Sequence, residues 1–576
     1  MASRILLATT TLAEHWHPTL DMDNGHYPLG LGYLQSVAEQ AGHRVECLFL
    51  VREAVATCTD KVLDAVECLA ADVLGLSVIT DNRVSAFRVI EAAHERFPGL
   101  RIVLGGIHVS TMYEQIVGRY PFVVAVLGEG EITLVDLLDA FETGRDLSEV
   151  QGIAFFRDGQ VVKTAERPLI EDLDSLPLPR HDIFYSPARQ QGQLLTSRGC
   201  PFTCSFCALD STSRRKVRTR SPTKVVDEIE KILSDHPQTT TIYVVDDQFF
   251  VDNKRVIAIC DEIVRRGIKC HFICQGRVRP LSRELVLALE RAGFIGVSLG
   301  LESGSAAVLE RCKKKISLED VERAVHLFAD SPISIEVLLI IGLPGENLTS
   351  IIETTDFCRK LQKIKYHSYD SKVQDLFIYP GTEIYEIAKA SGAIDDDFWL
   401  GDGVCPRFHV ELGPSEFISF REILLTRLSP SRLFTPGGFV AQREMVPLIL
   451  KYAYTSQSNF EGRHCIMELQ YRVLNTLMEQ GRLLLAKPIP EQVSFMTARR
   501  QFGSESAIFL DNDKLPSPLP ISFLVWWTYQ HQIAPLAHLI SDAVSTYLEE
   551  VYAKGADGIA ELRELYAEVP GPRLRY

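Results

Sequence analysis

The chain has 576 residues, of which 46% are hydrophobic and 23% are charged, with a formal net charge of −15. This is a globular composition, and the length predicts about three or four domains. The acidic balance excludes the electrostatic footprint of a nucleic-acid-binding protein. The 13 cysteines are scattered along a long chain, which indicates a reducing, cytoplasmic setting rather than a disulfide framework. Since no run of about 18 apolar residues occurs, we expect no membrane span.

Residues 1–145 alternate short apolar runs with helical stretches, which predicts a doubly wound parallel sheet. The expected strands are Ile5–Ala8, Val45–Leu50, Val73–Val78, Ile102–Leu104 and Phe122–Leu127. Ligands of such a sheet bind beyond the carboxyl ends of its strands. Residues at or just after the strand ends are therefore candidates for a ligand site: Ser77, Thr80, Gly105, Gly106, His108, Gly128 and Glu129.

Residues 146–190 are predicted to connect this domain to a second one. Asp158-Gly159 stands between two apolar runs, which is a strong signal for a β-hairpin. Leu176-Pro177-Leu178-Pro179 then favours an extended segment, because a residue before proline avoids the helical region.

Residues 191–400 resume the alternation with larger units, which predicts a partial (β/α)6 barrel. Ser221-Pro222 has the residue types of a helix cap and a first helical position. Beyond residue 410, apolar residues recur at helical spacing and predict a helical C-terminal domain, 410–576. The expected barrel strands are Leu194–Thr196, Thr241–Val245, His271–Cys274, Ile295–Leu301, Ile333–Ile341 and a sixth around Val373–Tyr379.

Cys200, Cys204 and Cys207 form a C-x3-C-x2-C triad just after the first of these strands. Three thiolates in so short a segment can hold a [4Fe–4S] cluster, and one iron then stays open for another ligand. A structural zinc site would need a fourth Cys or His nearby. Cys270 and Cys274 lie in an apolar run, where a free cysteine is more often a small buried hydrophobe. The spacing therefore favours a cluster over zinc or a disulfide.

Taken with further motifs, the triad resembles the signature of the radical S-adenosylmethionine (SAM) family, and the first domain resembles that of its cobalamin-binding subgroup. The barrel motifs, each after an expected strand, are Asp246-Asp247-x-Phe249, Gly300-Leu301-Glu302-Ser303-Gly304, Gly342-Leu343-Pro344-Gly345-Glu346 and Tyr379-Pro380-Gly381-Thr382. Those of the first domain are Pro28-Leu29-Gly30-Leu31-Gly32-Tyr33-Leu34, Gly105-Gly106-x-His108 and Gly128-Glu129-Gly130-Glu131. The resemblance covers residues 1–400 and leaves the C-terminal domain out.

The resemblance implies three cofactors: a [4Fe–4S] cluster on the three cysteines, SAM on the open iron, and cobalamin in a Rossmann-type first domain. The residues expected to contact SAM are Asp246, Asp247, Arg277, Glu302, Ser303 and Gly342. Ser77, Thr80, Gly105, Gly106, His108, Gly128 and Glu129 are expected around cobalamin. Simpler roles stay open for several of them: a solvated strand end for the Asp pair, a plain turn for Gly342, an ion pair for Arg277 and a loop histidine for His108. The D-x-H-x-x-G motif of many corrinoid proteins is absent, which leaves the lower axial ligand of cobalt open.

By the same resemblance, the activity is expected to be methylation of an unactivated carbon, or of phosphorus, in a small-molecule substrate. One SAM would methylate cobalt, and a second would yield a 5′-deoxyadenosyl radical that activates the substrate for transfer from methylcobalamin. An electron donor such as flavodoxin or ferredoxin is implied. The alternatives are a radical cyclase, ring-contracting or anaerobic oxidative enzyme of the same family, and a non-enzymatic corrinoid- or cluster-binding sensor or carrier.

Overall fold

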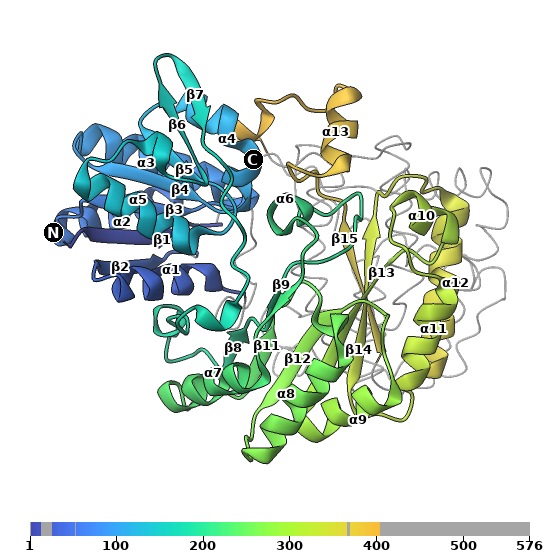
Figure 1. Cartoon of the computed structure of the whole chain (residues 1–576). Coiled ribbons are helices and arrows are strands. Elements are labelled where there is room, and N and C mark those ends of the chain that lie inside the picture. Colours follow the sequence, from blue (N-terminus) through green and yellow to red (C-terminus); the bar gives the residue numbers. More distant parts are fainter. Residues whose placement is uncertain (1, 13–25, 52, 366–368, 404–576) are drawn as a thin grey trace, which may run out of the picture. The chain divides into compact units, whose positions relative to one another are not determined.

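The structure is a computed structural model that describes residues 2–12, 26–51, 53–365 and 369–403. Met1–Glu346 and Asp356–Glu411 belong to one compact unit, which contains two large sheets (Figure 1). No helix within the described ranges is long and apolar enough to cross a membrane. The predicted helical domain, 410–576, lies outside the described residues.

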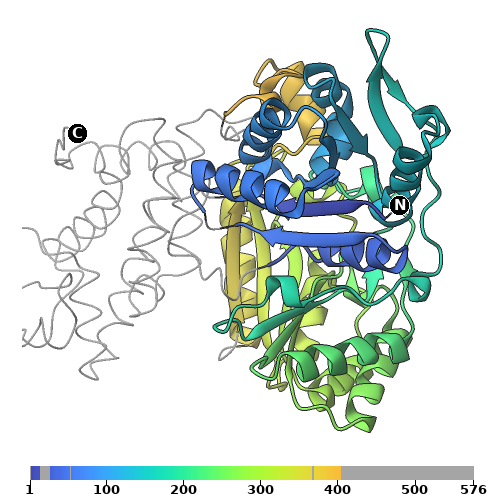
Figure 2. The ribbon, with the colours of Figure 1, turned by 90° about the vertical axis from the view of Figure 1, so that its left-hand side faces the viewer.

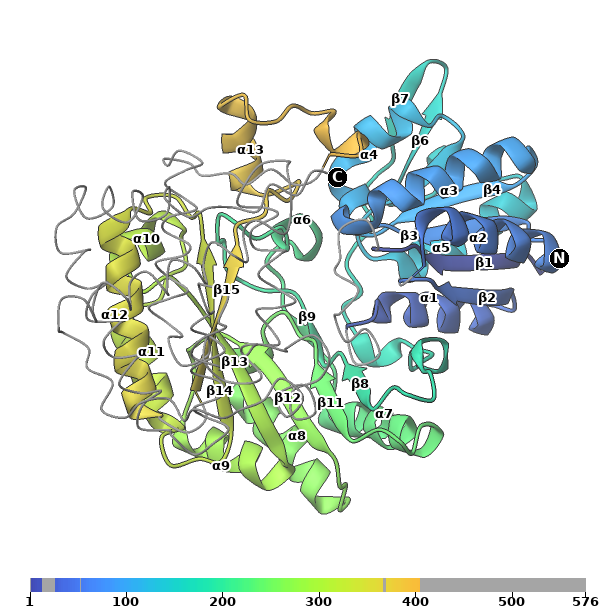
Figure 3. The ribbon, with the colours of Figure 1, turned by 180° about the vertical axis from the view of Figure 1, so that it is seen from behind.

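The first sheet has the strand order β2-β1-β3-β4-β5-β6-β7, and its first five strands are parallel. This confirms the predicted doubly wound sheet, because helices cover both of its faces (Figure 3). Its parallel strands are β1 (Arg4–Thr9), β2 (Arg44–Phe49), β3 (Val73–Ser77), β4 (Arg101–Gly105) and β5 (Val123–Val126). Its helices are α1 (Leu29–Gln40), α2 (Val55–Leu69), α3 (Arg83–Arg96), α4 (Ile107–Arg119) and α5 (Gly130–Thr143).

Strand β1 shows why these strands read as continuous apolar runs. Leu6 and Ala8 pack into the core beneath α2, α3 and α4, whereas Ile5 and Leu7 pack into the core beneath α1 and α5. All four side chains are at most 2% exposed. A strand that is buried on both faces has no polar side, so its sequence does not alternate.

The predicted hairpin at Asp158-Gly159 is present, but it belongs to the first sheet and not to a connector (Figure 2). Strand β6 (Ile153–Arg157) pairs antiparallel with β5, and β7 (Gln160–Lys163) pairs antiparallel with β6. The turn residues have φ of +52° and +80°, which suits a two-residue hairpin turn with left-handed residues. The first sheet therefore extends past residue 145, to Lys163.

The second sheet has the strand order β15-β14-β13-β12-β11-β8 and is parallel throughout, as the predicted partial (β/α)6 barrel requires. Its strands are β8 (Gln191–Leu194), β11 (Thr241–Val244), β12 (His271–Gly276), β13 (Phe294–Glu302), β14 (Ser334–Ile341) and β15 (Tyr369–Asp375). The sixth strand thus begins earlier than the sequence indicated. The helices of this part are α6 (Asp210–Ser213), α7 (Pro222–Asp235), α8 (Asn253–Arg265), α9 (Arg283–Ala292), α10 (Ala306–Arg311), α11 (Leu318–Leu327), α12 (Leu348–Ile364) and α13 (Glu383–Ala390).

Side-chain caps start several of the barrel helices, and that of α7 is the one predicted from the sequence. The Ser221 hydroxyl accepts a hydrogen bond from Lys224 N, and Pro222 holds the first helical position of α7. Asp252 and Ser282 cap α8 and α9 in the same way. Such caps satisfy backbone N–H groups that have no partner inside the helix. The caps therefore fix where these helices begin, and the loops between the strand ends and the caps are available for a site.

Candidate active site

The cysteine loop is closed at its base by a short antiparallel pair, β9 (Ser197–Arg198) and β10 (Arg218–Thr219). Gly199 links β9 to the loop with a φ of +91°. A side chain at Gly199 would overlap the carbonyl oxygen of Lys216, so this position requires glycine for the backbone angle and for the close approach of the two strands.

Cys200, Cys204 and Cys207 are free thiols, half-buried, and line one cavity of about 320 Å³ together with Phe202 and Leu209. Burial raises the pKa of the Cys200 thiol and raises that of Cys207 to about 11. Both thiols therefore need a bound cation or metal to ionise near neutral pH.

The three cysteines suit a cluster better than a single ion. Across the described ranges, no three His, Cys, Asp or Glu side chains converge as the ligands of one metal ion do. A cubane makes a different demand, because each thiolate binds a different iron and the sulfurs stay apart. Three free thiols on the wall of one cavity, beside Phe202 and Leu209, meet that demand.

Arg277 follows β12 and contacts the cysteine loop directly. Its Nη1 donates to Cys204 Sγ at 3.4 Å, and its guanidinium lies 3.8 Å from the centre of the Phe202 ring. Its Nη2 donates to the carbonyl oxygen of Lys314. The structure therefore brings Arg277 to the cysteines, which the sequence did not anticipate.

The two carboxylates after β11 differ in their surroundings. Asp246 is fully buried and accepts hydrogen bonds from Thr196 N at 2.6 Å and from the Thr196 and Ser197 hydroxyls at 2.5 Å each. Asp247 accepts from Gly199 N at 2.9 Å and presents exposed surface to a second cavity, described below. The surrounding protein reduces the solvation of the Asp247 carboxylate, and the negative charge of Asp246 lies nearby, so both effects raise the pKa of Asp247. Asp246 thus holds the chain that leads into the cysteine loop, while Asp247 is the member of the pair that faces a ligand space.

Glu302 ends β13 at an irregularity in the pairing with β14, and its φ is +71°. Its carboxylate binds the ammonium of Lys314 at 2.6 Å, and both residues are at most 8% exposed. Ser303, next in the chain, is also buried and accepts a hydrogen bond from Ser305 N at 3.2 Å. The Glu302 carboxylate is thus already engaged by a cation, and a ligand at this strand end would meet an ion pair.

Gly342 lies in a turn after β14, with φ of +101°. Its N–H donates to Glu346 Oε2 at 2.6 Å. Burial raises the pKa of Glu346 to about 8, although the N–H groups of Gly342 and Leu343 oppose this rise. The buried acid therefore closes the turn on itself, which supports the simpler role of a tight turn for Gly342.

A second cavity, of about 350 Å³, opens at the carboxyl ends of the first sheet. Five residues predicted from the sequence line it: Ser77, Gly105, Gly106, Gly128 and Glu129. Its other wall contains Arg198, Gly199 and Asp247. Gly199 thus borders this cavity while the next residue, Cys200, lines the cysteine cavity.

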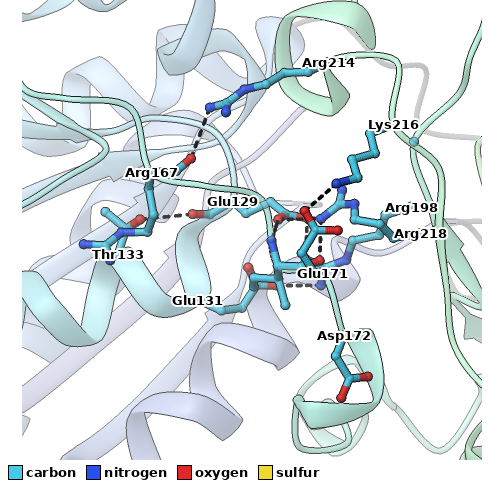
Figure 4. A network of polar contacts seen from close by, with 12 residues as sticks. Glu129, Glu131, Thr133, Arg167, Glu171, Asp172, Arg198, Arg214, Lys216 and Arg218 are labelled. Atoms are coloured by element: carbon cyan, nitrogen blue, oxygen red, sulfur yellow. Dashed lines mark hydrogen bonds and ion pairs between the residues drawn. The ribbon is translucent and has the colours of Figure 1, made fainter.

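Ion pairs join the loop after β5 to the base of the cysteine loop (Figure 4). Arg198 binds Glu129 at 3.1 Å and Glu131 at 2.5 Å, and Arg218 binds Glu129 at 2.7 Å. Ile170 N also donates to Glu129, at 2.8 Å. Burial alone would raise the pKa of Glu129, but Arg218, this N–H and Arg198 hold it below its usual range. Glu129 is therefore anchored to the barrel rather than free to bind a ligand.

Thr80 and His108 are not among the described residues that line this second cavity. His108 is 1% exposed and lies against Thr80, whose hydroxyl is 3.2 Å from Nδ1, and near the Trp399 ring. Burial lowers the pKa of His108 to about 3. These two residues pack with Arg83 and Trp399 in the opposite face of the domain, and their contact with a ligand stays a prediction.

Gly106 also has a packing reason of its own. Its φ is +105°, and a side chain there would overlap the carbonyl oxygen of Val78. Gly105 and Gly106 of this motif thus both line the cavity, Gly106 also makes a close backbone contact, and His108 is a buried imidazole.

The sequence missed the residues that join the two cavities. Arg198 and Arg218 are not among the site residues expected from the sequence, yet they bind the acidic residues after β5. Tyr33 lines the second cavity and lies 5.1 Å below the Arg198 guanidinium. The available signal was the pairing of an acidic motif, Gly128-Glu129-Gly130-Glu131, with an arginine two residues before Cys200.

Two family models match the chain at these sites. Residues 20–138 match the B12 binding domain, and residues 194–358 match the radical SAM superfamily. The first match contains the residues of the second cavity that follow β3, β4 and β5, and the second contains the three cysteines. The chain thus joins a match to the B12 binding domain to a match to the radical SAM superfamily.

Curated relatives of two kinds are similar to the chain. An anaerobic magnesium-protoporphyrin IX monomethyl ester cyclase of Rubrivivax gelatinosus is 32% identical over 345 residues, which are 58% of this chain and 62% of that protein. An uncharacterized methyltransferase of Pyrococcus horikoshii is 29% identical over 373 residues, 64% of this chain and 79% of that protein. The alignment thus spans somewhat less than two thirds of the cyclase.

Among solved structures, the cobalamin-dependent SAM radical enzyme OxsB, with aqua-cobalamin and SAM bound, matches with a TM-score of 0.64. The match covers 99% of this chain and 84% of OxsB at 17% sequence identity. At this identity the likeness is one of fold.

Proposed function

We propose that this protein is a cobalamin-dependent radical SAM enzyme that methylates an unactivated carbon, or phosphorus, of a small-molecule substrate. One observation carries the proposal: Gly199 borders the cavity at the ends of the first sheet, and Cys200 lines the cysteine cavity. A methyl carrier in the second cavity, at the ends of the first sheet, and a radical source in the cysteine cavity would therefore act on one substrate placed between them. A cluster carrier or a corrinoid carrier alone would need only one of these sites.

The residues of the chain divide the work as follows. Cys200, Cys204 and Cys207 would hold a [4Fe–4S] cluster, and SAM would bind above it at the carboxyl ends of the barrel strands. Ser77, Gly105 and their neighbours would receive cobalamin, where glycine lets the backbone approach a large ligand. When bound, the cluster supplies an electron for cleavage of SAM, and the corrinoid carries the methyl group.

Asp247 is the polar side chain best placed to meet the substrate or the face of the corrinoid. Its carboxylate opens into the second cavity and is fixed by the N–H of Gly199. The Glu129–Arg198 pair closes the same wall and keeps the cysteine loop in place. An external one-electron donor, such as a flavodoxin or ferredoxin, would supply the reducing equivalents from the cytoplasm.

The proposal is tested with the full chain, reconstituted anaerobically with iron, sulfide and hydroxocobalamin. SAM that carries a deuterated methyl group should yield 5′-deoxyadenosine, S-adenosylhomocysteine and a substrate with the deuterated methyl. Cys204→Ala should abolish 5′-deoxyadenosine, because two thiolates do not hold the cluster. A Cys204→Ala protein with the parent rate would contradict the assignment of the triad.

A second function, radical cyclisation or another anaerobic oxidation, is favoured by the similarity to the cyclase of Rubrivivax gelatinosus. The same assay separates it from methylation. A cyclase would form 5′-deoxyadenosine while no deuterated methyl appears in its product, and a methyltransferase would transfer the label.

A further inference from the structure

We infer that Arg277 is a positioning residue that holds Cys204 and sets the reduction potential of the cluster, rather than a ligand of the methionine carboxylate. The inference rests on the proposed function, because it concerns the cluster that the three cysteines would hold. It follows from how the arginine is fixed, from what its guanidinium touches, and from its charge.

The backbone around Arg277 fixes the direction of its side chain. Its N–H donates to Gln248 Oε1 at 2.9 Å, and the residue is 7% exposed. The preceding Gly276 packs so closely that a Cβ there would lie 2.5 Å from a ring carbon of Phe250 and 2.8 Å from Gln248 Oε1. The loop after β11 therefore packs tightly against the end of β12, and the Arg277 side chain extends from there to the cysteine loop.

The guanidinium has three partners, and two of them belong to the cysteine loop. Nη1 donates to Cys204 Sγ, the planar group lies over the Phe202 ring, and Nη2 donates to the carbonyl oxygen of Lys314. Lys314 is in turn tied to Glu302. Both terminal nitrogens of the guanidinium thus already donate to protein atoms. Since a bidentate contact to a carboxylate uses two such nitrogens side by side, Arg277 is poorly placed to make one.

A buried cation that donates to a cluster ligand acts on the redox equilibrium. Hydrogen bonds to the sulfurs and the local net charge set the reduction potential of an iron–sulfur cluster. Reduction adds a negative charge, which a fixed guanidinium stabilises more strongly than it stabilises the oxidised form. The contact with Phe202 adds a cation–π attraction and keeps the guanidinium beside the sulfur.

The test compares Arg277→Gln, Arg277→Lys and the control Arg279→Gln in the anaerobically reconstituted full chain. Arg279 lies two residues further on, with a side chain that is 54% exposed and contacts Asp320 and Lys315. The measurements, made without SAM, are the iron content and the potential from electron paramagnetic resonance during a reductive titration.

We expect Arg277→Gln to shift the reduction equilibrium at least about tenfold toward the oxidised cluster, or about 59 mV for one electron. Arg277→Lys should shift it less, because it keeps the charge and loses the fork, and Arg279→Gln should match the parent. An Arg277→Gln protein that keeps the parent circular dichroism but holds less iron than Arg277→Lys would also support the role.

A potential equal to the parent in both Arg277 variants overturns the inference. If SAM then binds at least about tenfold more weakly to Arg277→Gln, the residue is a carboxylate ligand as first expected. Failure of the proposed function looks different, because a parent protein that binds no cluster would show no signal in any variant.

Discussion

Glu129→Gln is predicted to loosen the junction between the first sheet and the cysteine loop. The carboxylate accepts from Arg198, Arg218 and the Ile170 N–H, and only 14% of its side chain is exposed. Arg218 is 4% exposed, so the change leaves a buried guanidinium beside a neutral amide. Removing one partner of a buried pair costs about 3–5 kcal/mol. Since glutamine keeps one acceptor oxygen and the site is partly exposed, we expect about 2 kcal/mol here.

The assay is hydrogen exchange of the Ile170 amide, because this N–H donates to Glu129 itself. At about 1.4 kcal/mol per tenfold change, a loss of about 2 kcal/mol corresponds to exchange about 30-fold faster. The matched control is Glu171→Gln, whose partner is Lys216 at 2.5 Å. Both side chains of that pair are more than half exposed, so we expect less than about 1 kcal/mol.

The two variants together decide whether the Glu129 ion pairs support this part of the fold. If the Ile170 amide exchanges less than about threefold faster in Glu129→Gln, and no faster than in Glu171→Gln, the argument from buried charge is refuted. Peptides from α3 serve as an internal reference, because that helix lies on the other face of the first sheet.

Three further predictions follow from the cavity and from two buried titratable groups. Gly105→Phe should abolish retention of hydroxocobalamin on gel filtration, whereas Gly105→Ala should not, because a Cβ there meets nothing closer than 3.9 Å. Burial holds the pKa of His108 near 3, so between about pH 6.5 and 3 only the unfolded chain binds a proton at this imidazole. The free energy of unfolding therefore falls on acidification through this range. His108→Gln should weaken that fall, as measured by urea midpoints at several pH values. Burial raises the pKa of Glu346 to about 8, so above the usual pKa of a glutamate only the folded chain keeps this proton. The free energy of unfolding therefore falls as the pH rises toward 8. Glu346→Gln should flatten this pH dependence, and an unchanged dependence would contradict the buried acid.

The sequence predicts the two sheets well because their strands carry a strong local signal. Apolar runs such as Val73–Ser77 are buried on both faces, and caps such as Ser221 mark the start of the next helix. Strand ends are predicted less well from the sequence. The sixth barrel strand begins at Tyr369, in a segment that is mostly polar and therefore gives little strand signal. The hairpin was recognised from its turn, but its membership of the first sheet depends on pairing with β5, which no local pattern encodes.

The candidate site was predicted in part, for a similar reason. Residues directly after a strand, such as Gly105 and Gly128, reach the cavity because all carboxyl ends of a parallel sheet meet at one edge. His108 is instead the second residue of α4, a helix that packs on the other face of the sheet from this cavity. Arg277 and Arg198 act across the fold, on residues distant in the chain, so their roles appear only once the strands are in place.

The hairpin also bears on how the protein behaves at high concentration. A parallel sheet ends in rows of unpaired backbone groups, which can pair with another chain and start aggregation. Here β7 forms one edge, and it is only four residues long and ends in Lys163. The other edge, β2, exposes Arg44 and Glu46, which pair with each other. Short length and outward charge thus discourage edge-to-edge pairing on both sides of the sheet.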